Sequence, residues 1–308
     1  MKKRTLLAAS IAATVLAATG RAQTRPVTLG VALASDTNPF YVEVKKGIEA
    51  RAKELGWRAS FVSANEVVSV QNDGIGDLIA KKVDAIIVSP IDTAAVVPSY
   101  EAALKAGIPI ISVVRTVQSP SQRVAVTGDF RKIGIDTGRW MAKAIQGKGQ
   151  VAMVAGPAGA ELFRNFAAGF EEGVKASPDI HIVFRKEGPL TREFGLRMAE
   201  DILVAHPDVR GIYCGNDEIA LGAVQAVAAA GKRGRVLVTG SNAVPAALRA
   251  VKAGALGMTV DLQPRAWGAL GVDTLARVLK GEAVPPIVGI DHLIVDQDNV
   301  DRLLAGAK

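Results

Sequence analysis

The residue types best suited to hold a small polar molecule gather in one short stretch, residues 34–41, which reads Ala-Ser-Asp-Thr-Asn-Pro-Phe-Tyr. Four hydrogen-bonding side chains precede two adjacent aromatic rings, although aromatic residues make up only 5% of the chain. The hydroxyls of a ligand need hydrogen-bond partners and its C–H faces need a flat apolar surface, so this combination suits a polyhydroxy ligand. The residues that we expect to contact it are Ser35, Asn38, Phe40 and Tyr41.

The same stretch also has a purely structural interpretation. Asn38 can cap a helix whose first position is Pro39, and both rings can lie in the core. The stretch follows the apolar run Val27–Ala34, so it forms a strand-to-helix turn at the carboxyl end of a strand. Open α/β sheets bind their ligands at such ends, and both interpretations therefore stay open.

Two further polar residues follow strand-like runs and carry the same ambiguity. Arg115 follows the run Ile108–Val113 and is either a solvated loop charge or a fixed cation of the site. Asn216 follows Gly211–Cys214 and either caps the next helix or hydrogen-bonds a ligand. Cys214 itself is interpreted as a buried structural thiol, and as the single Cys it rules out an intrachain disulfide.

Motifs for catalysis, metals and nucleotides are scarce. The three His residues are isolated, and the sequence contains no pair of His or Cys at the spacing of metal ligands. It also lacks a Gly-x-Ser-x-Gly elbow; Gly231-Lys232-Arg233 lacks the phosphate-loop spacing, and Gly156–Gly159 lacks the third glycine of a dinucleotide turn. We therefore expect no metal, no cofactor and no enzymatic activity.

Strand-like runs alternate with helical patterns from Val27 onward, which predicts an α/β fold with parallel sheets covered by helices on both faces. The clearest helical pattern places Tyr41, Val44 and Ile48 on one apolar face. The expected strands are Val27–Ala34, Arg58–Ser63, Ala85–Ser89, Ile108–Val113, Arg123–Val126, Gly149–Ala155, His181–Lys186, Gly211–Cys214, Val236–Thr239, Ala255–Val260 and Gly289–Val295.

A weak internal duplication predicts two similar lobes. Val83–Val113 and Val209–Ser241 share one layout, in which a strand, a polar turn, a helix and a second strand follow each other. The boundary between the lobes is expected near Gly128. If the lobes face each other, the polar turns at the carboxyl ends of the strands line one cleft together with residues 34–41.

The N-terminus reads as a secretory signal peptide over residues 1–22. Lys2-Lys3-Arg4 precede the uncharged run Thr5–Ala18, and small residues stand at Gly20 and Ala22. No later run is long enough to span a bilayer, so we expect an exported, periplasmic protein that is not membrane-embedded. Removal of the four basic residues of this segment takes the formal charge from +7 to +3, and the interspersed charges that remain predict no nucleic-acid partner.

Five ordered motifs resemble the periplasmic solute-binding proteins of the ribose/galactose-binding family. They are Asn38–Tyr41, Val83–Pro90, Ala106–Ile111, Ala205–Val209 with Asn216–Ala223, and Val278–Glu282. The resemblance implies two Rossmann-like lobes with parallel sheets, joined by three crossover strands, a fold shared with the ligand-binding core of the lactose-repressor family. It also implies a monomer that closes like a hinge over a sugar and delivers it to an ATP-binding-cassette importer in the inner membrane.

The implied lobes are residues 24–128 with 263–292 and residues 129–262 with 293–308. One alternative is a periplasmic receptor of the same fold that signals to a chemoreceptor or sensor kinase. An exported enzyme and a cytoplasmic repressor are less favoured, because the sequence shows neither a catalytic set nor a DNA-binding segment before the core.

Carried over residue by residue, the resemblance implies a site at Ser35, Asn38, Phe40, Tyr41, Arg115, Arg164, Phe166, Asn216, Asn242 and Gln263. Four positions depart from the pattern of ribose-binding members. Val114 and Asn242 stand where those members have Asp, Phe166 where they have Arg, and Leu262 where they have Gln. We therefore expect a ligand of sugar size that has fewer hydroxyls, or is partly apolar or carbonyl-bearing.

Overall fold

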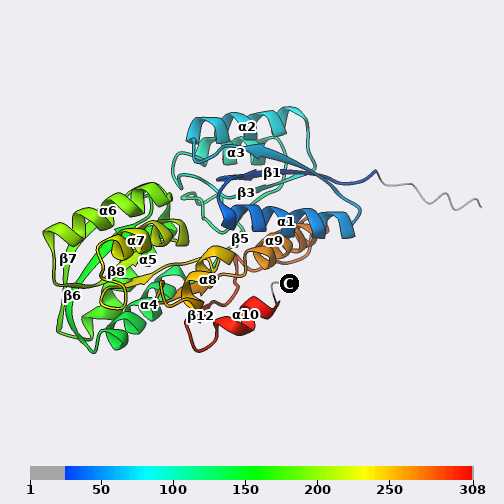
Figure 1. The fold of residues 1–308 in the computed structure, drawn as a ribbon. Coiled ribbons are helices and arrows are strands. Elements are labelled where there is room, and N and C mark those ends of the chain that lie inside the picture. The colour runs from blue at the N-terminus through cyan, green and yellow to red at the C-terminus, as the bar shows by residue number, and fades with distance from the viewer. Residues whose placement is uncertain (1–24, 307–308) are drawn as a thin grey trace, which may run out of the picture.

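The computed structural model describes residues 25–306, which form two α/β lobes side by side (Figure 1). The sheet of the first lobe has the strand order β11-β5-β4-β3-β1-β2, and all of its strands run parallel. These strands are β1 (Thr28–Leu33), β2 (Arg58–Ser63), β3 (Ala85–Val88), β4 (Ile110–Val113), β5 (Ala125–Val126) and β11 (Ile287–Val288).

Helices cover both faces of this sheet, so its central strands β3 and β4 are buried along their whole length, and β3 is entirely apolar. α1 (Pro39–Glu54) and α9 (Pro264–Leu279) pack together on one face, while α2 (Val68–Ala80) and α3 (Val97–Lys105) lie on the other (Figure 1). Successive residues of a strand point to opposite faces. Val31 therefore packs in the core under α1 and α9, whereas Ala32 packs in the core under α2 and α3.

The second lobe repeats this plan with a smaller parallel sheet in the order β7-β6-β8-β9. A short antiparallel pair, β10 with β12, adjoins it through a bridge between Thr239 and Met258. Its strands are β6 (Lys148–Ala155), β7 (Asp179–Glu187), β8 (Val209–Cys214), β9 (Leu237–Thr239), β10 (Thr259–Asp261) and β12 (Leu293–Val295). Its helices are α4 (Phe130–Ala144), α5 (Glu161–Lys175), α6 (Arg192–Ala205), α7 (Asp217–Ala229), α8 (Pro245–Lys252) and α10 (Val300–Gly306).

The chain passes between the lobes three times: between β5 and α4, between β10 and α9, and between β11 and β12. The third passage corrects one prediction, because the expected strand Gly289–Val295 does not exist as one element. β11 ends at Val288 in the first sheet and β12 begins at Leu293 in the second, so residues 289–292 span the gap. The expected strand Ala255–Val260 also begins too early. The N–H groups of Ala255 and Leu256 donate to the Ala250 carbonyl, and β10 begins only at Thr259.

The predicted α/β fold with two lobes and parallel sheets is confirmed. The expected signal peptide, residues 1–22, lies outside the described residues. Within residues 25–306, no helix is long and apolar enough to cross a membrane.

The two lobes touch each other near the carboxyl ends of their strands. The Thr93 N–H donates to the Gly159 carbonyl at 3.1 Å, and the Thr116 hydroxyl donates to Glu161 Oε2 at 2.8 Å. Both bonds join the first lobe to the start of α5 in the second. The structure therefore shows the lobes drawn together over the turns that follow the strands.

Candidate ligand-binding cleft

A cavity lies between the lobes, and its walls enclose about 360 Å³ when its open side is included. Residues of both lobes line it, mostly at or next to the carboxyl ends of strands. The lining residues are Asn38, Phe40, Tyr41, Val114, Arg115, Phe130, Leu162, Phe163, Phe166, Leu190, Asn216, Asn242 and Leu262. A wider groove, with Ser35, Asn65 and Glu66 on one side and Pro189 and Arg192 on the other, adjoins it at Asn38 and Leu190.

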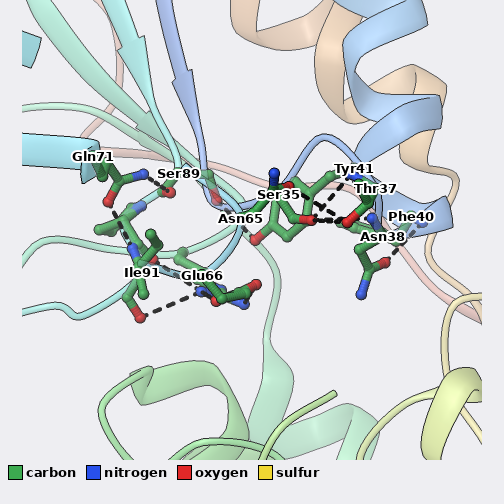
Figure 2. A network of polar contacts seen from close by, with 12 residues as sticks. Ser35, Thr37, Asn38, Phe40, Tyr41, Asn65, Glu66, Gln71, Ser89 and Ile91 are labelled. Atoms are coloured by element: carbon green, nitrogen blue, oxygen red, sulfur yellow. Dashed lines mark hydrogen bonds and ion pairs between the residues drawn. The ribbon is translucent and has the colours of Figure 1, made fainter. Parts of the chain in front are cut away.

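The turn between β1 and α1 supplies one wall, and in it the capping and binding interpretations are both compatible with the geometry. Asn38 is the N-cap of α1, and its Oδ1 accepts the Phe40 N–H at 3.0 Å. Ser35 Oγ accepts the N–H groups of Thr37 and Asn38 at 3.2 and 3.0 Å, so it fixes the turn (Figure 2). Ser35 is therefore a support of this wall and lines the outer groove, whereas Asn38 lines the cavity itself.

Two aromatic rings follow the cap. Phe40 and Tyr41 meet edge to face, with ring centroids 5.3 Å apart. The Tyr41 hydroxyl shares a hydrogen bond of 3.0 Å with Ser89 Oγ, at the end of β3 (Figure 2). Burial raises the pKa of Tyr41, so the phenol is neutral and its ring, rather than a charge, faces the cavity.

The second lobe and the crossover facing this wall are also aromatic. Phe130 and Phe166 pack edge to face at 5.2 Å, and Phe130 stacks on Trp267 at 6.2 Å. Phe163 lies next to Phe166 on α5, with ring centroids 6.4 Å apart. The family resemblance pointed to Phe166 and to the position of Leu262. It did not point to Phe130, Leu162, Phe163 or Leu190, which the approach of the two lobes makes part of the cavity wall.

Arg115 is buried to 1% exposure, and its terminal nitrogens are already engaged within its own lobe. Nη1 donates to the Glu66 carboxylate at 3.1 Å and Nη2 donates to it at 3.0 Å. Nη1 also donates to the carbonyls of Pro90 and Ile91, each at 3.3 Å. Its Nε has no hydrogen-bond partner within residues 25–306. Burial lowers the pKa of Arg115, but the nearby Tyr41 and Glu66 outweigh that effect and raise it, so the guanidinium stays charged.

Sequence reasoning missed both supports of this arginine. Glu66 and Asn65 adopt left-handed backbone angles, with φ of 61° and 47°, which aims the Glu66 turn at the cleft. Gln71 is buried on α2, donates to the Ser89 carbonyl and accepts from the Ile91 N–H (Figure 2). It therefore holds the loop whose carbonyls accept hydrogen bonds from Arg115. The only available signal for Glu66 was its place in a polar turn directly after a strand.

Asn216 and Asn242 form the polar part of the opposite wall. Asn216 is the N-cap of α7: its Oδ1 accepts the Ile219 N–H at 2.9 Å, while its Nδ2 is buried and no described residue hydrogen-bonds it. Asn242 follows β9 with φ at 127°, and its N–H donates to the Val260 carbonyl at 2.9 Å.

A buried carboxylate that sequence reasoning missed braces the Asn242 loop from behind. Asp217 is fully buried and accepts hydrogen bonds from Thr259 Oγ1 at 2.6 Å and from the Val244 N–H at 2.9 Å. Thr259 Oγ1 in turn accepts the Ala243 N–H at 3.1 Å. Burial raises the pKa of Asp217 to about 7, against an ordinary value of 3.8.

Besides Ser35, two of the predicted site residues lie outside the cavity wall. Arg164 is exposed, and its Nη1 donates to the Ala158 carbonyl. Gln263 is exposed in a left-handed conformation, and its Nε2 donates to the Asp291 carbonyl at 3.2 Å. Phe166 and Leu262, rather than Arg164 and Gln263, line the cavity, so its wall is apolar at these two positions.

The structure thus brings seven predicted residues to one cavity: Asn38, Phe40, Tyr41, Arg115, Phe166, Asn216 and Asn242. The walls are predominantly apolar, with amide groups and one paired guanidinium as polar points. Among residues 25–306, no group of three or more His, Cys, Asp or Glu is placed to hold a metal ion. Such a cavity can enclose a compact organic molecule and hydrogen-bond it from both sides.

Comparison with known proteins agrees with the two-lobe α/β fold. Residues 29–283 match a family described as periplasmic binding protein domain. The chain is 32% identical over 257 residues to the ribose import binding protein of Bacillus subtilis (strain 168), with 83% of each chain covered. An ABC transporter solute-binding protein from Actinobacillus succinogenes 130z with bound D-allose superposes with a TM-score of 0.85 at 28% identity, covering 90% of this chain and 99% of the other. One from Mycobacterium smegmatis with bound glycerol has a TM-score of 0.86 at 31% identity, with 90% and 96% covered. The chain belongs to the periplasmic binding protein domain family.

Proposed function

We propose that this protein is an exported solute-binding protein that captures a sugar or sugar-like molecule between its lobes and delivers it to an ABC importer. The relatives with the same fold are a ribose import protein and solute-binding proteins with bound allose and glycerol. Their names support a sugar-sized polar solute and an importer as the partner. They are named as binding proteins, in keeping with a role in capture rather than catalysis.

The observation that carries the proposal is that one cavity is walled by both lobes. Asn38 and Arg115 come from the first lobe, and Asn216 and Asn242 come from the second. A ligand that contacts all four binds the closed arrangement better than an open one and so shifts the population toward closure. An importer that recognises the closed shape then receives only loaded protein.

The hinge of this motion is proposed to lie at the three passages between the lobes. The moving bodies are residues 24–128 with 263–292 and residues 129–262 with 293–308. Seven of the predicted residues are proposed to contact the ligand, and Ser35 is proposed to support Asn38 through the turn, whereas Arg164 and Gln263 lie outside the wall. We further propose that the protein is a monomer in the periplasm.

Small-angle scattering with calorimetry tests the proposal on protein purified from a periplasmic extract. A sugar-sized ligand should bind with one site per chain and lower the radius of gyration, because closure brings the lobes together. Asn38→Ala and Asn242→Ala, one from each lobe, should each weaken binding, while Asn299→Ala, at a half-buried position outside the cavity, should not. Binding without compaction would overturn the hinge mechanism. Loss of uptake in cells that lack this protein would separate transport from a sensory role.

A further inference from the structure

The cavity wall contains hydrogen-bond donors that the protein leaves unpaired. Arg115 Nε and Asn216 Nδ2 have no partner among the described residues, although their side chains are only 1% and 2% exposed. Because Asn216 Oδ1 accepts the Ile219 N–H, the other end of this amide, Nδ2, is the donor that remains free. Buried donors without acceptors are unfavourable, so both nitrogens call for oxygen acceptors on a ligand.

Acceptors in the same wall are few. None of the thirteen lining residues described above is Asp or Glu. The amide oxygens of Asn38 and Asn216 already accept the N–H groups of Phe40 and Ile219. The Tyr41 hydroxyl is engaged with Ser89, which leaves the Asn242 amide as the main acceptor side chain that the protein's own contacts do not use.

The positive charge of Arg115 in the cavity wall is also neutralised by the protein itself. Glu66 holds Arg115 through two hydrogen bonds, so the positive charge has its counter-ion within the first lobe. The rings of Tyr41 and Phe163 lie against the guanidinium, with its carbon 5.5 and 5.6 Å from their centroids. An anionic ligand would compete with Glu66, and a cationic one would meet no carboxylate in the wall.

Hydroxyl and carbonyl oxygens differ in what they require of such a wall. Each buried hydroxyl brings a proton that needs an acceptor, whereas a carbonyl or ring oxygen brings only lone pairs. We propose that the cavity is selective for an uncharged ring compound with carbonyl oxygens and few hydroxyls, for which a sugar lactone is the simplest sugar-sized example. This inference rests on the proposed function and narrows its ligand. Asn216 and Glu66 are the specificity-determining residues: one presents a donor and the other neutralises Arg115.

Calorimetric titration with four related compounds tests the selectivity. Ribose, ribonolactone, deoxyribose and deoxyribonolactone differ stepwise in hydroxyl count and in the presence of a carbonyl. Each lactone should bind about tenfold more tightly than its parent sugar, because one unpaired buried hydroxyl proton is removed. Ribonate, the open anion, should bind more weakly than ribonolactone.

The variant Asn216→Asp tests whether the free donor at Asn216 causes the lactone preference. Asp also caps a helix, so the fold should be retained, but the free donor becomes an acceptor. The lactone preference should fall about tenfold or reverse. Asn72→Asp, which adds the same charge on α2 away from the cavity, should leave the preference unchanged, and thermal unfolding of both variants checks their folding.

The outcomes separate this inference from the proposed function. Parent sugars that bind as tightly as their lactones, or lactones that do not bind at all while sugars do, overturn the inference and leave sugar binding intact. An unchanged preference in Asn216→Asp overturns the role of the free donor. If no compound of the series binds, both the inference and the proposed sugar-like ligand fail.

Discussion

At the scale of single residues, the site depends on polar side chains that do not line the cavity. Glu66 and Gln71 hold Arg115 and its loop, and Asp217 holds the loop that carries Asn242. These supports are buried or partly buried, and each joins backbone segments that are distant in sequence. They keep the groups that line the cavity in one arrangement before a ligand binds, which reduces the entropy lost on binding.

Asp217 makes stability depend on pH in a defined direction. Its pKa is about 7 in the folded protein, because of burial, and near 3.8 in an unfolded chain, so the folded state binds more protons between these values. Its contribution to stability is full at low pH and is lost as the pH rises through about 7. Asp217→Asn removes this titration, so the change in unfolding free energy between about pH 5 and about pH 8 should become smaller in the variant.

Urea unfolding at the two pH values measures this effect. Asp298→Asn, at an exposed position whose own side chain makes no hydrogen bond in the structure, is the matched control and should keep the pH dependence of the parent protein. A parent protein that gains stability between these pH values, with Asp217→Asn behaving identically, would contradict the assignment.

At the scale of elements, close helix pairs set the position of the aromatic wall. α4 and α5 touch through glycines, and a Cβ atom added at Gly134 would lie 2.2 Å from the Phe166 carbonyl oxygen. Any larger residue there must push α5 away from α4. Since α5 carries Leu162, Phe163 and Phe166, the packing of two helices controls the width of the cavity.

Gly134→Ala should therefore lower both stability and ligand affinity. Overpacking of this kind costs about 1–3 kcal/mol of unfolding free energy. Gly76→Ala on α2 is the control, because an added Cβ there meets nothing within 4 Å and alanine favours the helix. Urea unfolding should show Gly76→Ala at or above the parent stability. Equal effects of the two substitutions would contradict the proposed role of the α4–α5 contact.

At the scale of the whole molecule, hydrogen bonds between the lobes stabilise the closed arrangement. Thr116 on the first lobe donates to Glu161 at the start of α5, and the Thr93 N–H donates to Gly159 beside it. Both bonds require the lobes to be together. They lie at the cleft and stabilise the closed form relative to the open form. A ligand that requires the closed form should therefore bind more tightly.

Thr116→Val removes the first of these bonds and keeps the shape of the side chain. Ligand affinity should fall about three- to tenfold, because the closed form loses one hydrogen bond that the open form lacks. Thr116→Ser keeps a hydroxyl and should bind like the parent protein. Calorimetric titration with ribonolactone measures the affinity. An affinity unchanged in Thr116→Val would show that this bond does not contribute to closure.

Sequence reasoning alone could determine the alternation of strands and helices, the two-lobe plan and most of the polar turns at strand ends. These depend on local periodicity and on turn residues such as Asn38 and Pro39, whose preferences act over a few neighbours. The tertiary structure decided what those turns do. Glu66 could not be paired with Arg115 from the sequence, because 49 residues separate them and only the sheet order brings their loops together. The position of Leu262 was indicated only by the family resemblance. Phe163 could not be assigned to the cavity from the sequence, since an apolar side chain follows the same pattern whether it packs against protein or lines a cavity.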